Sequence, residues 1–286
     1  MFLGSNISLA QMALATAHSG GGSTPLLDTY PSTAAYSVAR LLRTAYAGDA
    51  ILVRRASDNA EQAIGFVSGE LDAASLATFC SGTDGFVKTV YDQQGSNDAT
   101  QTTTSAQPKI YDSVTGVITS NGKPAAYYSG NSQVLLTSSA LAIMTAKRHS
   151  TFTVSEQVSG ASNVLSAFST ANWSLSMSIG SPTFVLFDGS WRTAASRTLS
   201  ANVQYVAACI RSGDTTVDSY VNDSEYLANT CGDVAFGATV CGLGRHPTSS
   251  GAQVHYNQEW IHYANDQTAN QVAIRANINA FYGAYV

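Results

Sequence analysis

Charged residues are scarce in this chain of 286 residues, and their scarcity excludes one class of partner. Asp, Glu, Lys and Arg make up 12 % of the chain, about half of the roughly 25 % found in ordinary soluble domains. The net charge is -5, and basic residues cluster only as the pairs Arg54-Arg55 and Lys147-Arg148. Binding to a phosphate backbone needs a basic patch, and neighbouring residues of a strand point to opposite faces. We therefore expect no nucleic-acid partner.

Cysteine is also rare, and its spacing excludes the usual metal motifs. Cys80, Cys209, Cys231 and Cys241 form no CxxC pair and no His-paired zinc spacing, so we expect buried thiols and no bound metal. Cys231 and Cys241 flank ten residues that could form a hairpin. A disulfide between them therefore stays open if the protein matures outside a reducing cytosol.

The first 27 residues contain no charged side chain at all. A secretory signal needs a basic start and a continuous apolar stretch, and a membrane span needs about 20 mostly apolar residues. This segment has neither, so we expect no signal peptide and no membrane insertion. Leu3, Ile7, Ala10 and Leu14 follow one stripe of a short helix, and the linker SGGGSTP follows it. We expect residues 1–24 to be an assembly arm that docks onto other chains, with a disordered tail as the alternative.

Residues 25–286 read as one domain that is rich in strands. Helical spacing of Ala35, Val38, Leu42 and Ala45, between a Ser32 cap and Gly48, predicts a short helix after the linker. From Ala50 the apolar residues instead alternate with polar ones in short runs between turn residues. The runs that predict strands are AILVRRAS, AIGFVS, GFVKTVYD, VLLTSSALAIMTAK, STFTVSEQVS, NWSLSMSIG, PTFVLFDG, VQYVAACIRS, TVDSYVND and AQVHYNQEWIHY.

Helical spacing returns only at the C-terminus. Asn265 or Asp266 is expected to cap a helix that carries Ile274, Ile278 and Phe281 on one side, and Gly283 is expected to end it. Because strands and helices do not alternate along the chain, a parallel α/β sheet is disfavoured. The pattern predicts an all-β antiparallel jelly-roll β-sandwich with two short helices.

Three segments resemble landmarks of the concanavalin-like (LamG-type) jelly-roll domain. They are RTAYAGDAILVRRASDNAEQAIGF, GFVKTVYDQQGSNDATQTTTSAQPKI, and GLGR followed by GAQVHYNQEWIHYANDQTANQVAIRANINAFYGAY. The resemblance, which runs from about Leu26 to the C-terminus, is to the branch shared by α-L-arabinofuranosidase B catalytic domains and phage tail and virion proteins. In these enzymes a short Cys-x4-Cys loop occurs where this chain has Cys80 and Gly85, so Cys80 is expected to be a buried free thiol.

The loop VYDQQGSNDATQ, residues 90–101, follows the second landmark. Its expected role is structural: Tyr91 packs inward, while Asp92 and Asn97 satisfy the backbone of a glycine turn. A calcium ion held between loops stays open, although Asp92, Ser96 and Asp98 do not follow the EF-hand order.

Catalysis is not expected from the motifs, because glycoside hydrolysis with retention needs two carboxyl groups about 5 Å apart. Arg245-His246 stands where the resemblance implies a carboxylic acid. Glu156 is the only glutamate between Ala125 and Asn202, and it lies outside any motif that resembles the enzymes' nucleophile segment. We therefore expect a non-enzyme that releases no arabinose.

Aromatic residues near turns are then the best candidates for binding a sugar, because sugar rings stack on Trp and Tyr while amides and carboxylates bind the hydroxyls. Trp191 leads this group, and Trp173 and Trp260 are expected in the core. The candidate carbohydrate-binding residues are Trp191, Arg192, Tyr127, Tyr128, Asp92, Gln93, Asn97, Arg245 and His246.

The favoured hypothesis from the sequence is a homo-oligomeric phage or virion surface protein, a decoration, fibre or tail component with a lectin-like domain that binds host glycans. Its partners would be other virion or scaffold proteins, held through residues 1–24. An extracellular protein is the other location considered. The alternative function is a glycoside hydrolase of the α-L-arabinofuranosidase type.

Overall fold

The computed structural model describes residues 24–130, 132–139, 141, 146–159, 163–168, 174–177, 184–187, 191–193, 199–233, 240–245 and 254–286. The expected docking arm with its Leu3, Ile7, Ala10 and Leu14 stripe lies outside these residues. In this part of the chain no helix is long and apolar enough to cross a membrane.

Helices are few and short in the described part of the chain. They are α2 (Leu26–Thr29), α3 (Ala73–Phe79), α4 (Gln271–Tyr282) and a 3-10 turn at Thr104–Ala106. The strands of the first half are β1 (Ala34–Ser37), β2 (Ile51–Arg55), β3 (Glu61–Ile64), β4 (Phe66–Val67), β5 (Glu70–Leu71), β6 (Gly85–Val90), β7 (Ala99–Thr100), β8 (Lys109–Asp112), β9 (Gly116–Val117), β10 (Thr119–Ser120), β11 (Lys123–Pro124), β12 (Ala126–Tyr128) and β13 (Leu135–Thr137). Those of the second half are β14 (His149–Ser159), β15 (Asn163–Phe168), β16 (Ser174–Met177), β17 (Phe184–Phe187), β18 (Trp191–Thr193), β19 (Gln204–Arg211), β20 (Thr216–Val221), β21 (Ser224–Thr230), β22 (Cys241–Leu243) and β23 (Val254–Tyr263).

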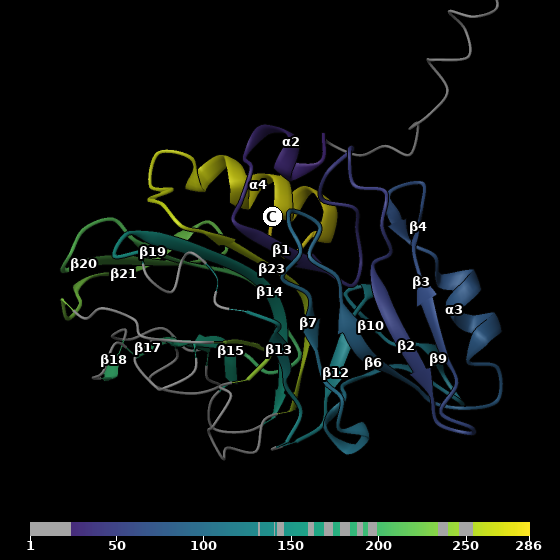
Figure 1. The fold of residues 1–286 in the computed structure, drawn as a ribbon. Coiled ribbons are helices and arrows are strands. Elements are labelled where there is room, and N and C mark those ends of the chain that lie inside the picture. The colour runs from purple at the N-terminus through teal and green to yellow at the C-terminus, as the bar shows by residue number, and fades with distance from the viewer. Residues whose placement is uncertain are drawn as a thin grey trace, which may run out of the picture.

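Antiparallel pairing organises the sheet, and its centre is the long pair β14 and β23. Strand β14 pairs with β19 on one side and with β23 on the other, while β23 also pairs with β1 and β12. In Figure 1, α4 and α2 lie over one face of this central region, and β13, β15 and β17 lie on its other side. The predicted antiparallel jelly-roll sandwich is therefore confirmed.

Two apolar clusters lie on opposite sides of this central pair. One packs beneath α4 and α2 and includes Phe152, Val154 and Ile261. The other includes Tyr36, Tyr128 and Trp260. Successive residues of a strand alternate between faces, so β23 contributes to both clusters, through Ile261 to one and through Trp260 to the other. The prediction that Trp260 is a core residue is confirmed, because its side chain is fully buried, whereas Trp173 lies outside the described residues.

The predicted helix between Ser32 and Gly48 is wrong. Ala34–Ser37 form β1, all four residues are buried, and Ala34 pairs with His262 of β23. Alanine-rich spacing fits a helix, but backbone pairing to a central strand outweighs such a weak local preference. The described helix in this region is the single turn α2, which precedes it.

The predicted C-terminal helix is confirmed, with a later start. Asn270 precedes its first residue, while the Asp266 carboxylate accepts hydrogen bonds from Thr268 in the preceding turn. Ile274 and Ile278 are buried against the sheet. Gly283 ends the helix in the left-handed conformation with a φ of 61°, which glycine adopts without steric cost.

The cysteines are buried as expected. Cys80 is a free thiol that follows α3, and a Cβ atom added to Gly85 would lie 2.5 Å from its sulfur. Gly85 therefore stands against Cys80, where the resemblance implies a disulfide partner. Cys231 and Cys241 are thiols whose sulfurs lie near the backbone carbonyls of Asp214 and Gly242.

Candidate functional site

The VYDQQGSNDATQ loop has a structural role, and two of its residues are removed from the candidate binding set. Asp92 is 1 % exposed, and its carboxylate accepts hydrogen bonds from the backbone N–H groups of Ala35, Gln94 and Asn97. Gln93 is equally buried; its amide accepts from Leu42 N and donates to the Arg40 carbonyl. Polar atoms that already hold the backbone are not available to a sugar, so the expectation that Asp92 and Gln93 bind one is wrong.

The other candidates are scattered. Asn97 contacts Ser139 through its side chain and Tyr36 through its carbonyl. The glycine turn is therefore held by the carboxylates of Asp92 and Asp98, and the Asn97 side chain takes no part. Tyr127 is half-buried and Tyr128 is fully buried on the opposite face of β12, so they do not line one site. The side chains of Trp191 and Arg192, and the whole of His246, lie outside the described residues. Arg245 is partly buried, and its Nε atom has no partner in the described chain.

A stronger candidate emerges from the two faces of β14 and β23. Val154 pairs with Glu259 and Ser155 pairs with Asn257, so Gln258 bulges out of the ladder. Residues paired in register share a face. We call the face that carries Val154 and Glu259 the covered face, because α4 lies over it, and we call the opposite face the inner face.

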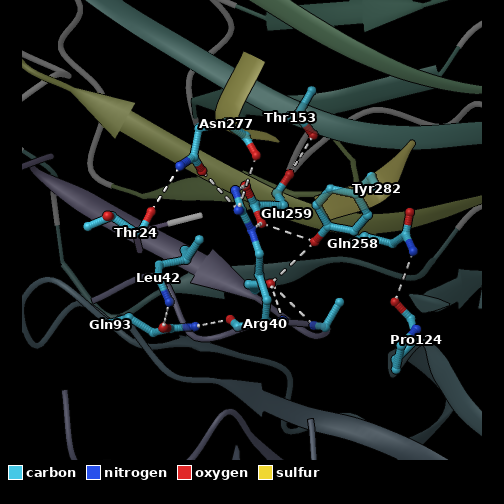
Figure 2. A network of polar contacts seen from close by, with 12 residues as sticks. Thr24, Arg40, Leu42, Gln93, Pro124, Thr153, Gln258, Glu259, Asn277 and Tyr282 are labelled. Atoms are coloured by element: carbon cyan, nitrogen blue, oxygen red, sulfur yellow. Dashed lines mark hydrogen bonds and ion pairs between the residues drawn. The ribbon is translucent and has the colours of Figure 1, made fainter. Parts of the chain in front are cut away.

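The apolar cluster of the covered face encloses one buried ion pair, which is fully hydrogen-bonded. Arg40 Nε and NH2 each lie 2.8 Å from one carboxylate oxygen of Glu259. Tyr282 OH donates to the same carboxylate at 3.0 Å, and Arg40 NH1 donates to the Asn277 side chain. Burial lowers the pKa of Arg40, but the adjacent Glu259 carboxylate outweighs it and raises the pKa overall. Figure 2 shows this network joining β23 to α4.

The inner face carries a row of polar side chains, which is interrupted on β23 by the apolar Trp260. Strand register places side chains from neighbouring strands beside one another: Thr151 pairs with both Cys209 and His262, and Gln157 pairs with His255. All of these side chains are buried. The inner-face polar residues are Thr151, Thr153, Ser155 and Gln157 of β14 and His255, Asn257 and His262 of β23.

Several polar atoms of the inner face have no hydrogen-bond partner in the described part of the chain. They are Ser155 Oγ, Asn257 Nδ2, His262 Nε2 and both ring nitrogens of His255. Their neighbouring atoms are paired: Thr153 Oγ1 lies 3.3 Å from Asn257 Oδ1, and Thr151 Oγ1 lies 3.1 Å from His262 Nδ1. A buried polar group without a partner costs about 1–3 kcal/mol. A row of them therefore points to a polar ligand or bound water.

Burial keeps the inner-face histidines neutral. It lowers the pKa of His255 and of His262 to about 3 each. The Gly244 backbone favours the charged His255 slightly, but neither ring nitrogen meets it at hydrogen-bonding geometry. A neutral imidazole has one donor and one acceptor, so these rings can bind hydroxyl groups in either direction.

One end of the inner face is shaped by an aromatic stack. Tyr128 and His255 lie parallel, with centroids 4.6 Å apart and planes 5° from parallel. The backbone of Gly244 passes so close that an added Cβ atom would lie 2.4 Å from the Tyr128 ring. Its φ of +84° also favours glycine. The stack fixes the His255 ring in one orientation.

Uncharged donors and acceptors of this kind suit a neutral polyhydroxy ligand. The acidic residues of β14 and β23 are Glu156 and Glu259, and both belong to the other face. Among the described residues no group of three or more His, Cys, Asp or Glu is placed to hold a metal ion. The unpaired groups of the inner face are therefore uncharged hydrogen-bond donors and acceptors.

This face could not be identified from the sequence because its residues look like ordinary alternation. His255 and His262 stand seven positions apart in one strand, and Ser155 lies about 100 residues earlier. One signal was present: the inward positions of STFTVSEQVS are all polar, whereas a strand between two apolar layers has apolar residues on both faces.

Comparisons with known proteins find similarity to arabinofuranosidases. The model of the α-L-arabinofuranosidase B catalytic domain matches residues 27–167, just under half of the chain. An arabinofuranosidase/β-xylosidase of Trichoderma koningii and an α-L-arabinofuranosidase of Hypocrea jecorina are each 42 % identical over 66 residues, which are 23 % of this chain and 13 % of theirs.

Solved structures show the same fold. A GH54 α-L-arabinofuranosidase soaked with a cyclic sulfate inhibitor matches with a TM-score of 0.68 at 15 % identity, over 90 % of this chain and 63 % of that one. An arabinofuranosidase in complex with arabinofuranosyl-α-1,2-xylobiose matches with a TM-score of 0.62 at 16 % identity and the same coverage. The chain thus spans less than two thirds of the proteins that it matches.

These findings overturn the favoured hypothesis. The expectation of a non-enzymatic phage or virion surface protein is wrong, as is the virion location, because the family model, the curated relatives and the matched structures named above are all arabinofuranosidases. The prediction of a non-enzyme was based on two short motifs that differ from those of the enzymes. The similarity to the catalytic domain instead extends over the strands of residues 27–167. The described chain has the β-sandwich fold of the α-L-arabinofuranosidase B catalytic domain.

Proposed function

We propose that this protein is a glycoside hydrolase that acts on α-L-arabinofuranosyl groups. The observation that carries the proposal is the row of buried, unpaired and uncharged polar atoms on the inner face, within the fold of arabinofuranosidase catalytic domains. The similarity of residues 27–167 to that catalytic domain supports the reaction, and β14 belongs to the matched segment.

The inner face would hold the sugar and exclude water from it. Ser155 Oγ, Asn257 Nδ2 and the ring nitrogens of His255 offer both donors and acceptors to hydroxyl groups. A site whose buried polar groups pair with a ligand's hydroxyls strongly rejects analogues that lack them. Selectivity for the arabinofuranosyl group over other sugars would come from these contacts.

The test measures arabinose release by the full chain. Nitrophenyl α-L-arabinofuranoside and soluble arabinoxylan should each release product, and Asn257→Leu should lower kcat/KM by about tenfold or more, because one donor to a hydroxyl is lost. Lys88→Ala, which removes an ion pair outside β14 and β23, is the matched control and should keep wild-type turnover. Absence of arabinose from both substrates would contradict the proposal.

A further inference from the structure

A second feature, distinct from the inner face, runs across the outside of the sheet. Strand register aligns one residue from each of five neighbouring strands: Phe86 pairs with Lys109, Lys109 with Tyr127, Tyr127 with Tyr256, and Tyr256 with Glu156. All five side chains are half-buried. We call these residues the outer row, and four strand spacings make it roughly 19 Å long.

The middle of the outer row is an aromatic platform. The Tyr127 and Tyr256 rings lie 5.0 Å apart between centroids, with planes tilted by 36°. Burial, the adjacent Tyr127 and the Glu156 carboxylate together raise the pKa of Tyr256, so the Tyr256 hydroxyl keeps its proton at neutral pH. A pair of partly exposed aromatic rings can stack against the C–H face of a sugar.

Polar groups flank the platform on both sides. Glu156 Oε2 accepts a hydrogen bond from Ser120 Oγ at 2.6 Å, which fixes the carboxylate beside Tyr256. On the other side, Lys109 Nζ lies 2.7 Å from Asp84 and 5.9 Å from the centre of the Phe86 ring. Asp84 and Asp112 together offset the Lys109 charge and Glu156 adds a further carboxylate, so the row favours an uncharged chain over an anionic one.

The outer row ends where the buried part of the same face begins. The next residue in register is Gln204, which is buried and bonded to Gln258. Beyond it, Asn121 donates to the Tyr282 carbonyl at the end of α4. The row thus borders the polar contacts of Gln204 and Asn121, which join this face to the end of α4.

We propose that the outer row binds the main chain of a neutral polysaccharide and tethers it to the protein. The length of the row fits several sugar units, its rings supply stacking, and Glu156 supplies an acceptor for hydroxyls. The row lies on the opposite face of the sheet from the unpaired inner-face atoms, so it holds the polymer near the protein without orienting the bond to be cleaved. The identity of the polymer as an arabinose-bearing xylan rests on the proposed function.

The experiment is affinity electrophoresis of the full chain in gels that contain soluble arabinoxylan. Wild-type protein should be retarded, and the double variant Tyr127→Ala/Tyr256→Ala should bind at least about tenfold more weakly, because both stacking rings are lost. The double variant Tyr127→Phe/Tyr256→Phe should keep most of the binding. Tyr285→Ala, a half-buried tyrosine outside the row, is the matched control and should be retarded like wild type.

The melting temperature of each variant checks that it is folded. Glu156→Gln is a milder variant, and its binding to arabinoxylan should be weaker by a few fold. Wild-type mobility that arabinoxylan does not change would overturn the proposal, as would unchanged retardation of the double alanine variant. Retardation without arabinose release would refute the proposed function and support binding of the polysaccharide by the outer row. Arabinose release without retardation would support the proposed function and refute binding by the outer row.

Discussion

The two faces of the central pair β14 and β23 differ in whether their buried polar groups have hydrogen-bond partners. On the covered face, Arg40 and Glu259 are almost completely buried, and both carboxylate oxygens and the guanidinium are paired. On the inner face, equally buried groups such as Ser155 Oγ and Asn257 Nδ2 have no partner in the described chain. The difference teaches that burial alone does not identify a site. A row of unpaired polar atoms on one face is the stronger indication, because stability alone gives no reason to keep it.

The largest expected effect comes from breaking the ion pair of the covered face. Glu259→Gln leaves the Arg40 charge buried and uncompensated, so the free energy of unfolding should fall by about 3–5 kcal/mol. Chemical denaturation would measure the loss. The double variant Arg40→Met/Glu259→Leu should recover most of it, because no buried charge remains. A loss below about 1 kcal/mol in Glu259→Gln would show that the pair does not hold α4 in place.

The next largest effect is expected in the pH dependence of stability, and it arises from the buried histidines of the inner face. His255 and His262 have a pKa of about 3 in the folded chain, below the usual value of about 6.5 in the unfolded one. Below pH 6.5 the unfolded chain therefore binds more protons, so stability is full above pH 6.5 and falls as pH drops towards 3. Each histidine should contribute on the order of 1 kcal/mol per pH unit in that window. Denaturation at pH 7 and 5 should show a shallower loss in His262→Gln, and an unchanged slope would contradict neutral burial.

A surface ion pair should contribute much less to the free energy of unfolding than the buried pair does. Lys88 and Glu61 lie 2.7 Å apart and are about one third exposed, so Lys88→Ala should cost less than about 1 kcal/mol because solvent screens the pair. The same denaturation assay at low and high salt checks it. A cost comparable to that of Glu259→Gln would mean that the contrast between the faces does not arise from burial.

The smallest change in stability is expected on the inner face itself. Ser155→Ala removes a hydroxyl that has no partner in the described chain, so the free energy of unfolding should stay within about 0.5 kcal/mol of wild type or rise slightly. Denaturation without ligand measures this. A loss of 1 kcal/mol or more would show that Ser155 is satisfied, for example by bound water, and would weaken the argument for a ligand.

Much of the fold could be predicted because it depends on local patterns. Alternation in STFTVSEQVS and AQVHYNQEWIHY predicts β14 and β23, and Gly283 marks the end of α4. The prediction failed at Ala34–Ser37, where helical spacing was present but pairing with β23 decided the structure. Local preference among alanines amounts to tenths of a kcal/mol, whereas burial of four residues in a sheet contributes several.

The sequence by itself determined the all-β class, the scarcity of charge and the buried thiol of Cys80, because composition and period-two alternation are properties of short segments. Only the tertiary structure decided the candidate sites. The register that sets Gln157 beside His255, and Tyr127 beside Tyr256 and Glu156, depends on pairing between strands that lie far apart in the chain. The bulge at Gln258 keeps Glu259 on the covered face while Asn257 stays on the inner one. A shift of one residue exchanges the two faces of a strand, so tertiary pairing decides which side chains form a site.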